Sequence, residues 1–185
     1  MDTIDISIIE AAKLNAEQKT EILQLQRQCF PDVSAQEVEE DFCRPPVAIV
    51  LACSQNVLVA CAEVFEREIE CNGRPISIGG FSPCASEGLR GKGIGTAICK
   101  AAMSYLKEQA CAIAFLSVDT KHNSHPLYER LGFKMLAKPF IYANARGELK
   151  ESDGGMIAPL CEPELFENIL QTDKPLTLTP EVGYW

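Results

Sequence analysis

The sequence predicts an α/β fold with a mixed, mostly antiparallel central sheet flanked by helices. The first half carries apolar strand patterns joined by turn signals. The strongest of these is Asn72-Gly73, because a type I′ turn needs positive φ at both central residues. In the second half, strand and helix patterns alternate along the chain. A length of 185 residues with 46% hydrophobic residues suits one domain over 1–185 with a sizeable core.

The elements of the first half follow from local patterns. Ile4–Glu10 alternates apolar and polar residues and is expected to be a strand. Asn15 is expected to cap a helix over Ala16–Cys29, and the capping-box pattern Ser34-Ala35-Gln36-Glu37 begins a second, short helix. The inward side chains expected on the first helix are Ile22, Leu23 and Leu25. The next strands are expected at Val47–Cys53, Val57–Glu70 and Ile76–Ala85.

The second half continues with a long helix and a buried strand. Apolar residues spaced three and four apart predict a helix from Ile94 to Leu106. Cys111–Val118 is a continuous apolar run of buried-strand length, and Ser124–Leu131 is expected to be a short helix with Gly132 just past its end. The remaining expected elements are a final hairpin of Phe140–Ala145 with Met156–Leu160, a closing helix Pro163–Gln171 and an extended tail Thr172–Trp185.

The charge balance narrows the class of partner. A formal net charge of -9 argues against nucleic acid, because phosphate binding needs a basic face. It favours a cationic substrate, since an acidic cleft concentrates cations, although plain solubility explains the same charge.

Cysteine usage and the terminal segment indicate a compartment. The nine cysteines are odd in number, lack a Cys-x-x-Cys pair and mostly lie in apolar segments, which indicates packed thiols and a cytoplasmic protein. Residues 1–5 do not resemble a signal peptide. No apolar run approaches the length of a membrane span, so no membrane partner is expected.

The loop Arg90-Gly91-Lys92-Gly93-Ile94-Gly95 carries the strongest chemical signal. It lies between a predicted strand and a long helix, so its glycines and the free amides of the helix could hold a phosphate or pyrophosphate. A Rossmann fingerprint would need glycine where Thr96 stands, and the Gly-Lys-Ser/Thr of a P-loop is absent. A glycine-rich turn without a ligand remains the alternative from these residues alone.

Two motifs together resemble one family. The segment from Leu89 to Ile98 is similar to motif A of the Gcn5-related N-acetyltransferase (GNAT) superfamily, whose pattern is Gln/Arg-x-x-Gly-x-Gly/Ala. Pro126-Leu127-Tyr128-Glu129-Arg130-Leu131-Gly132-Phe133 resembles its motif B, and the core motifs span residues 76–142. The resemblance implies the GNAT fold, acetyl-coenzyme A (acetyl-CoA) as co-substrate without a metal, and an amine as acceptor.

The resemblance also implies roles for individual residues. The amides that would hold the CoA pyrophosphate belong to Arg90, Gly91, Lys92, Gly93, Ile94, Gly95 and Thr96. Cys84 and Ala85 would pair with the pantetheine arm through their backbone, although Pro83 departs from the usual Val-x-Val strand. Tyr128 would protonate the departing thiolate, with simple helix packing as its alternative role. Asn123 is carried over as a cofactor contact at a spacing shorter than usual.

A general base is suggested by strand register. If Asn72-Gly73 forms a two-residue turn, counting back along the hairpin sets Glu63 opposite Ser82, beside the cofactor strand. A partly buried Glu63 would have a raised pKa and could accept a proton through water. A solubility charge on an edge strand is the equal alternative. His122 and His125 lack further ligands at metal-site spacing, so loop polarity or helix capping is expected for them.

The C-terminus ends in Gly183-Tyr184-Trp185. Similar tails ending in Trp occur in aminoglycoside 2′-N-acetyltransferases, which places Trp185 in the acceptor pocket; filling a surface groove for stability is the alternative. The expected function is direct acetyl transfer from acetyl-CoA to the amine of a small cationic, polyamine-like or aminoglycoside-like molecule. A protein or peptide acceptor and a non-catalytic acyl-CoA-binding module are the alternatives, and a homodimer is left open.

Overall fold

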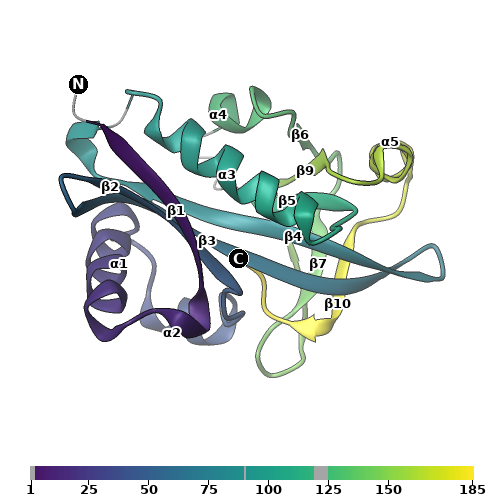
Figure 1. Cartoon of the computed structure of the whole chain (residues 1–185). Coiled ribbons are helices and arrows are strands. Elements are labelled where there is room, and N and C mark those ends of the chain that lie inside the picture. Colours follow the sequence, from purple (N-terminus) through teal and green to yellow (C-terminus); the bar gives the residue numbers. More distant parts are fainter. Residues whose placement is uncertain (1–2, 90, 119–124) are drawn as a thin grey trace.

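The computed structural model describes residues 3–89, 91–118 and 125–185 (Figure 1). The strands are β1 (Ile4–Glu10), β2 (Ala48–Ser54), β3 (Val57–Cys71), β4 (Arg74–Ala85), β5 (Ile113–Ser117), β6 (Lys134–Met135), β7 (Phe140–Ala143), β8 (Leu149–Ser152), β9 (Gly155–Pro159) and β10 (Thr177–Val182). The α-helices are α1 (Ala16–Cys29), α2 (Ala35–Glu40), α3 (Ile94–Glu108), α4 (His125–Glu129) and α5 (Pro163–Gln171), and short 3-10 turns cover Ala11–Lys13 and Glu87–Leu89.

The sheet is mixed and mostly antiparallel, as the sequence predicted. Its order runs β6-β9-β5-β4-β3-β10-β7-β8, with β2 paired to β3 and β1 to β2. Parallel pairing occurs between β4 and β5 and between β10 and β7. The long strands β3 and β4 therefore connect the N-terminal meander to the C-terminal half of the sheet.

The hairpin register predicted from Asn72-Gly73 is confirmed. Both turn residues have positive φ, 52° and 79°, and Cys71 pairs with Arg74. No register shift interrupts the pairing, so Glu63 lies opposite Ser82. The Gln55-Asn56 turn has the same positive-φ form, with φ of 50° and 63°.

Helices α1 and α3 cover opposite faces of the sheet (Figure 1). Side chains alternate between the faces of a strand, so even-numbered β3 residues such as Ala62 and Val64 pack with α3. Odd-numbered residues such as Cys61 pack with Ile22 and Leu25 of α1. The predicted N-cap at Asn15 and the predicted capping box at Ser34 both form, and Asn15 makes a capping box as well, which fixes where α1 and α2 begin.

Two expectations were wrong in part. Leu23 of α1 is 47% exposed rather than inward, because the sheet contacts only the Ile22 and Leu25 side of the helix. The final hairpin joins β7 to β8, whereas β9 pairs with β5 and β6. The tail is extended as expected, and its residues 177–182 form β10, which pairs with β7 and with β3.

Candidate active site

The strands β4 and β5 separate part-way along their length. Their pairing ends at Ile78–Ile113 and Gly79–Ala114, although both strands continue. Beyond this point the backbone groups of β4 that face β5 lose their ladder partners. The separation opens the middle of the sheet where β4 leads into the glycine-rich loop.

Alternation decides which β4 residues face this opening. Ser86 N–H donates to Val59 O at 2.9 Å, and Ala112 N–H donates to Ser77 O at 2.8 Å. The backbone N–H and C=O groups of even-numbered β4 residues therefore point to β3, and those of odd-numbered β4 residues point to β5. Ala85 presents its backbone to the opening, whereas the backbone of Cys84 points to β3 and its thiol packs against Cys61, with the two sulfurs 3.3 Å apart. Pro83 is tolerated because its missing N–H would face the opening.

The glycine-rich loop leads directly into α3. Gly91 and Gly93 have φ of 77° and 85°, and a Cβ at either would meet no atom within 4 Å. Gly93 is the N-cap of α3 and offers no side-chain cap, so the first amides of the helix (Ile94, Gly95 and Thr96) point out unused by any cap side chain. Lys92 is exposed beside them. Arg90 lies outside the described residues, as do Asn123 and His122.

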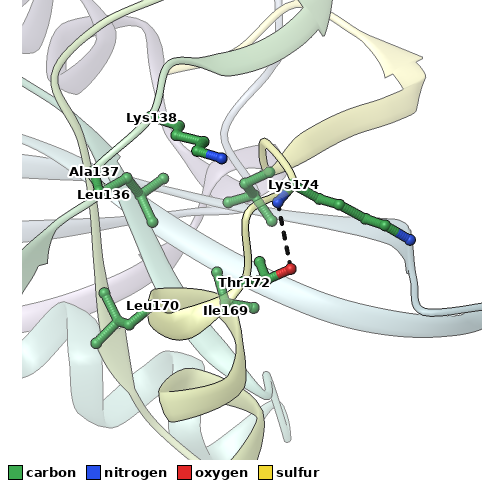
Figure 2. Close-up of a pocket in the computed structure, with 8 residues that line it drawn as sticks. Leu136, Ala137, Lys138, Ile169, Leu170, Thr172 and Lys174 are labelled. Carbon is green, nitrogen blue, oxygen red and sulfur yellow. Dashed lines mark hydrogen bonds between the residues drawn. The ribbon is translucent and has the colours of Figure 1, made fainter.

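A cavity of about 960 Å³ lies on the α1 side of the sheet. Its floor includes Glu63 and Phe65 of β3, Ser82 of β4 and Ser117 of β5, and its outer wall is made by α1, α2 and the segment between them. A volume of this size suits a whole small molecule. A second hollow, between Leu136 and the end of α5, measures about 20 Å³, which is room for one water molecule (Figure 2).

Glu63 lies in the floor of the cavity. It is half-buried on an internal strand, between β2 and β4, so the edge-strand alternative does not describe its position. Burial raises the pKa of its carboxyl, and a hydrogen bond from Gln26 of α1 lowers it by less. The carboxyl is thus placed to hold or accept a proton closer to neutral pH than an exposed glutamate.

Tyr128 lies on the α3 side of the molecule. Its side chain is 8% exposed, meets Phe133 edge-on at 5.9 Å between ring centroids and belongs to the core cluster under α3. Burial raises the pKa of its phenol, with the neighbouring Cys99 as a smaller cause. Tyr128 does not line the cavity, so it and Glu63 approach the sheet from opposite faces.

Trp185 lies where β4 and β5 part. Its indole N–H donates to Phe115 O at 3.0 Å, and its ring stacks on Phe65 at 5.5 Å with an interplanar angle of 5°. Gly80 permits this approach, since a Cβ there would be 1.8 Å from the indole nitrogen. Trp185 is 7% exposed and also lines the cavity. Trp185 therefore fills the opening between the two strands and also forms part of the cavity lining.

Arg67 of β3 holds the tail in place. Its guanidinium donates to the carbonyl oxygens of Leu178 (2.7 Å), Val182 (3.1 Å) and Gly183 (2.7 Å) and lies 5.1 Å from the centroid of the Trp185 ring. The side chain is 3% exposed. Burial, and less so the charge of Arg44, lowers the pKa of Arg67 to about 10, which leaves it charged at neutral pH.

Several cavity residues had no signal in the sequence. Phe65, Ser117 and the wall residues of α1 and α2 lie in different segments that only the fold brings together. Arg67 could have been suspected, because a charged residue stands between the apolar Phe65 and Ile69 in a strand whose alternation predicts an inward side chain. Pairing with carbonyls of the tail could not have been read from this pattern.

Comparisons with known proteins agree with this arrangement. The sequence matches the acetyltransferase (GNAT) family over residues 19–133. The fold is similar to the ribosomal-protein-S18-alanine N-acetyltransferase from Escherichia coli, with a TM-score of 0.56, 13% identity, and coverage of 84% of this chain and 94% of that chain. It is also similar to ElaA from Escherichia coli, with a TM-score of 0.61, 18% identity, and coverage of 84% of this chain and 99% of that chain. For a chain of the NatC complex bound to Gag peptide and CoA, the TM-score is 0.55 and the identity 17%, with coverage of 84% of this chain and 99% of that chain.

The family match spans more than half of the chain, and the chain therefore belongs to the GNAT family of acetyltransferases. It is an acetyl-CoA-dependent N-acetyltransferase, and the structural likenesses, all at low identity, concern the fold. No curated protein sequence gave a significant match. The open glycine loop ahead of an uncapped helix and the parted strands β4 and β5 fit a long co-substrate that carries a pyrophosphate.

Two further observations concern the described residues alone. Across residues 3–89, 91–118 and 125–185, no group of three or more His, Cys, Asp or Glu side chains is arranged to hold a metal ion. Within the same part of the chain, no helix has the length and apolar character needed to cross a membrane.

Proposed function

We propose that the enzyme transfers the acetyl group of acetyl-CoA to the amine of a small cationic molecule that binds in the cavity of about 960 Å³ beside Glu63. The observation that carries the proposal is the position of this cavity. It reaches Ser82 on β4 and Ser117 on β5, where the two strands have parted, so an acceptor and a thioester could meet there from opposite faces of the sheet.

The donor is held, in this proposal, by two parts of the chain. The amides from Arg90 to Thr96 bind the pyrophosphate, aided by the positive end of the α3 dipole. The backbone of Ala85 pairs with the pantetheine arm, and Cys84, whose backbone points to β3, is left out of this pairing. Asn123, which lies outside the described residues, is kept as a cofactor contact on the family resemblance alone. The positive φ of Gly91 and Gly93 supports the first of these assignments.

The reaction is a direct attack. The neutral amine nitrogen forms a bond to the acetyl carbon while the bond from that carbon to sulfur breaks. The proton lost by the amine goes to Glu63 through water, and the sulfur takes a proton from Tyr128. A backbone N–H of β4 in the opening polarises the carbonyl. The raised pKa of Glu63 supports its role as base, because such a carboxylate holds the proton better than an exposed one.

Trp185 lines the acceptor end in this proposal. Its position in the lining of the cavity supports this placement. The buried thiols Cys61, Cys84, Cys99 and Cys111 support a reducing, cytoplasmic location.

The test is release of the CoA thiol from acetyl-CoA in the presence of small amines, polyamines, aminoglycosides and short peptides. Thiol release should require an amine and should yield the N-acetylated product by mass spectrometry. Transfer only to peptides would replace the small-molecule acceptor by a peptide, and tight CoA binding without transfer to any amine would favour a non-catalytic module.

A further inference from the structure

Several polar groups that line the cavity already have partners within the protein. The indole N–H of Trp185 is used by Phe115 O at 3.0 Å. Ser152 and Ser117 interact with the phenol of Tyr184 and lower its pKa, although burial has the larger, opposite effect. Arg44, which also lines the cavity, donates to Glu66 O and pairs with Glu181. These groups offer a ligand mainly their carbon surfaces, because their polar atoms already have partners.

The aromatic part of the floor is preformed. Phe65 and Trp185 are stacked, and Phe42 packs on Tyr184 with 4.8 Å between ring centroids. Phe65, Tyr184 and Trp185 are each less than a tenth exposed, so their positions are fixed by the core. A flat, rigid apolar surface of this kind favours a ring or a compact alkyl group over a hydrated polyol.

The wall of the cavity exposes further apolar side chains. Leu23 is 47% exposed, Phe30 40%, Val33 39% and Val38 48%, and all four line the same cavity. A cluster of partly uncovered apolar side chains around one cavity marks a place where an apolar ligand removes surface from water. Leu23 is therefore turned away from the sheet toward the ligand space.

The floor of the cavity offers a cationic ligand one carboxylate, and the exposed Arg27 adds positive charge to the wall. Glu63 is the half-buried carboxylate of the floor, and Gln26 takes up part of its hydrogen-bonding capacity. The other carboxylates that line the cavity, Glu39 and Asp153, are exposed, and water and salt screen them. A polycation such as a polyamine or aminoglycoside would place its additional ammonium groups against Phe65, Trp185 and the apolar wall, where they would lose hydration without gaining partners.

Resting on the proposed function, we infer that the acceptor is a primary amine borne on an apolar body the size of a ring, with the amine at Glu63 and the body between the Phe65–Trp185 floor and the apolar wall of α1 and α2. A free monoamine and the first residue of a peptide with an apolar side chain share this chemistry.

Acetylation kinetics test the inference. The probes are 2-cyclohexylethylamine, a peptide with N-terminal Phe, spermidine and an aminoglycoside, each with saturating acetyl-CoA. The cyclohexyl amine or the Phe peptide should have a kcat/KM at least about tenfold above that of the polycations, and the preferred one of the two identifies the source. Equal or better turnover of spermidine or the aminoglycoside would overturn the inference and leave the transferase function standing.

Variants of the wall provide a second measurement. The double change Leu23→Gln and Val38→Gln alters exposed helix positions, so folding should be retained. It should raise KM for the cyclohexyl amine at least about fivefold while KM for acetyl-CoA stays within twofold. Leu149→Gln is the matched control, because Leu149 is 69% exposed and does not line the cavity. An unchanged KM in the double variant would refute the apolar contact.

Binding can be followed without catalysis. Trp185 is the sole tryptophan, and an apolar amine that displaces water beside its ring should give a saturable blue shift of its emission. The saturated ring of the probe does not absorb light at the wavelengths that excite indole, so the emission comes from the protein. If the cyclohexyl amine shifts the emission but no thiol is released from acetyl-CoA, the proposed function is wrong and the inferred ligand class stands. If the amine causes no emission shift and no thiol release, the proposed function and the inferred ligand class are both wrong.

Discussion

Glu63 and Tyr128 are the side chains whose protonation the proposed reaction uses, and burial raises the pKa of both. For Glu63, a raised pKa means that the folded protein binds the proton more tightly than the unfolded chain. This stabilising contribution is full below the pKa of an exposed glutamate and is lost as pH rises through the folded value. At neutral pH the carboxylate therefore costs stability, which is consistent with a residue placed for chemistry rather than for the fold.

Glu63→Gln is expected to lower kcat by about 10²-fold or more and to remove the acid limb of the kcat/KM profile. In the unmodified enzyme this limb should have an apparent pKa above that of an exposed glutamate. Two amines of different pKa separate it from ionisation of the acceptor. Stability at neutral pH should be unchanged or higher. Glu39→Gln, at an exposed carboxylate of the same cavity, is the control, and an unaltered profile in Glu63→Gln would exclude Glu63 as the base.

Tyr128→Phe is expected to lower kcat by an order of magnitude or more while the melting temperature changes little, because the ring still packs on Phe133. The raised pKa keeps the phenol protonated through neutral and mildly alkaline pH, so Tyr128 should add no alkaline limb in that range. Tyr105→Phe is the control, since Tyr105 packs against the same core cluster. If kcat is the same in Tyr128→Phe, the tyrosine has no part in the reaction.

At the scale of elements, the glycine loop and the start of α3 form one unit. The positive φ of Gly93 lets the chain turn into the helix with no side chain over its first amides. The same conformation recurs at Gly147, in the turn between β7 and β8, where φ is 79° and a Cβ would also meet open space. A side chain would strain the backbone at both positions, because both have positive φ. Only Gly93 lies at the proposed cofactor site.

Gly93→Ala and Gly147→Ala should each cost about 1–2 kcal/mol of unfolding free energy, because alanine is strained at positive φ. Only Gly93→Ala should also raise KM for acetyl-CoA, by an expected fivefold or more. Denaturant unfolding and initial rates measure the two effects. If both variants have the same KM for acetyl-CoA, the loop does not take part in cofactor binding.

At the scale of the whole molecule, the C-terminal tail joins distant parts of the sheet. Arg67 connects β3 to carbonyls of residues 178–183, Gly183 N–H donates to Ala143 O at 2.7 Å, and Tyr184 N–H donates to Asp41 O at 2.8 Å. These contacts place Trp185 in the opening between β4 and β5, so the fold and the lining of the cavity depend on the same interactions.

Arg67→Met is expected to lower the unfolding free energy by about 2–4 kcal/mol, since three carbonyls lose their donor. The Trp185 emission should shift to the red and KM for the acceptor should rise, as the tail is released from the opening. Arg74→Met is the matched control. Arg74 forms an exposed pair with Glu162, and its loss should cost no more than about 1 kcal/mol. If Arg67→Met is destabilised but its KM for the acceptor is unchanged, the tail does not contribute to acceptor binding.

The sequence by itself determined the features that depend on neighbours along the chain. Asn15 and Ser34 begin their helices because a cap acts on amides two or three residues away. Asn72-Gly73 fixes its hairpin, and the uninterrupted register then sets Glu63 opposite Ser82. The glycine loop and the start of α3 followed from spacing in the same local way.

Only the tertiary structure decided where distant segments meet. β9 pairs with β5 rather than with β7, and Leu23 faces the cavity rather than the sheet. Trp185 reaches a carbonyl 70 residues away, and Arg67 reaches one 111 residues away. No local pattern encodes such contacts, because they depend on which surfaces the packed sheet leaves uncovered. The glycine loop ahead of α3 was therefore predictable from sequence, whereas the cavity appeared only when the tail and α1 were packed against the parted strands.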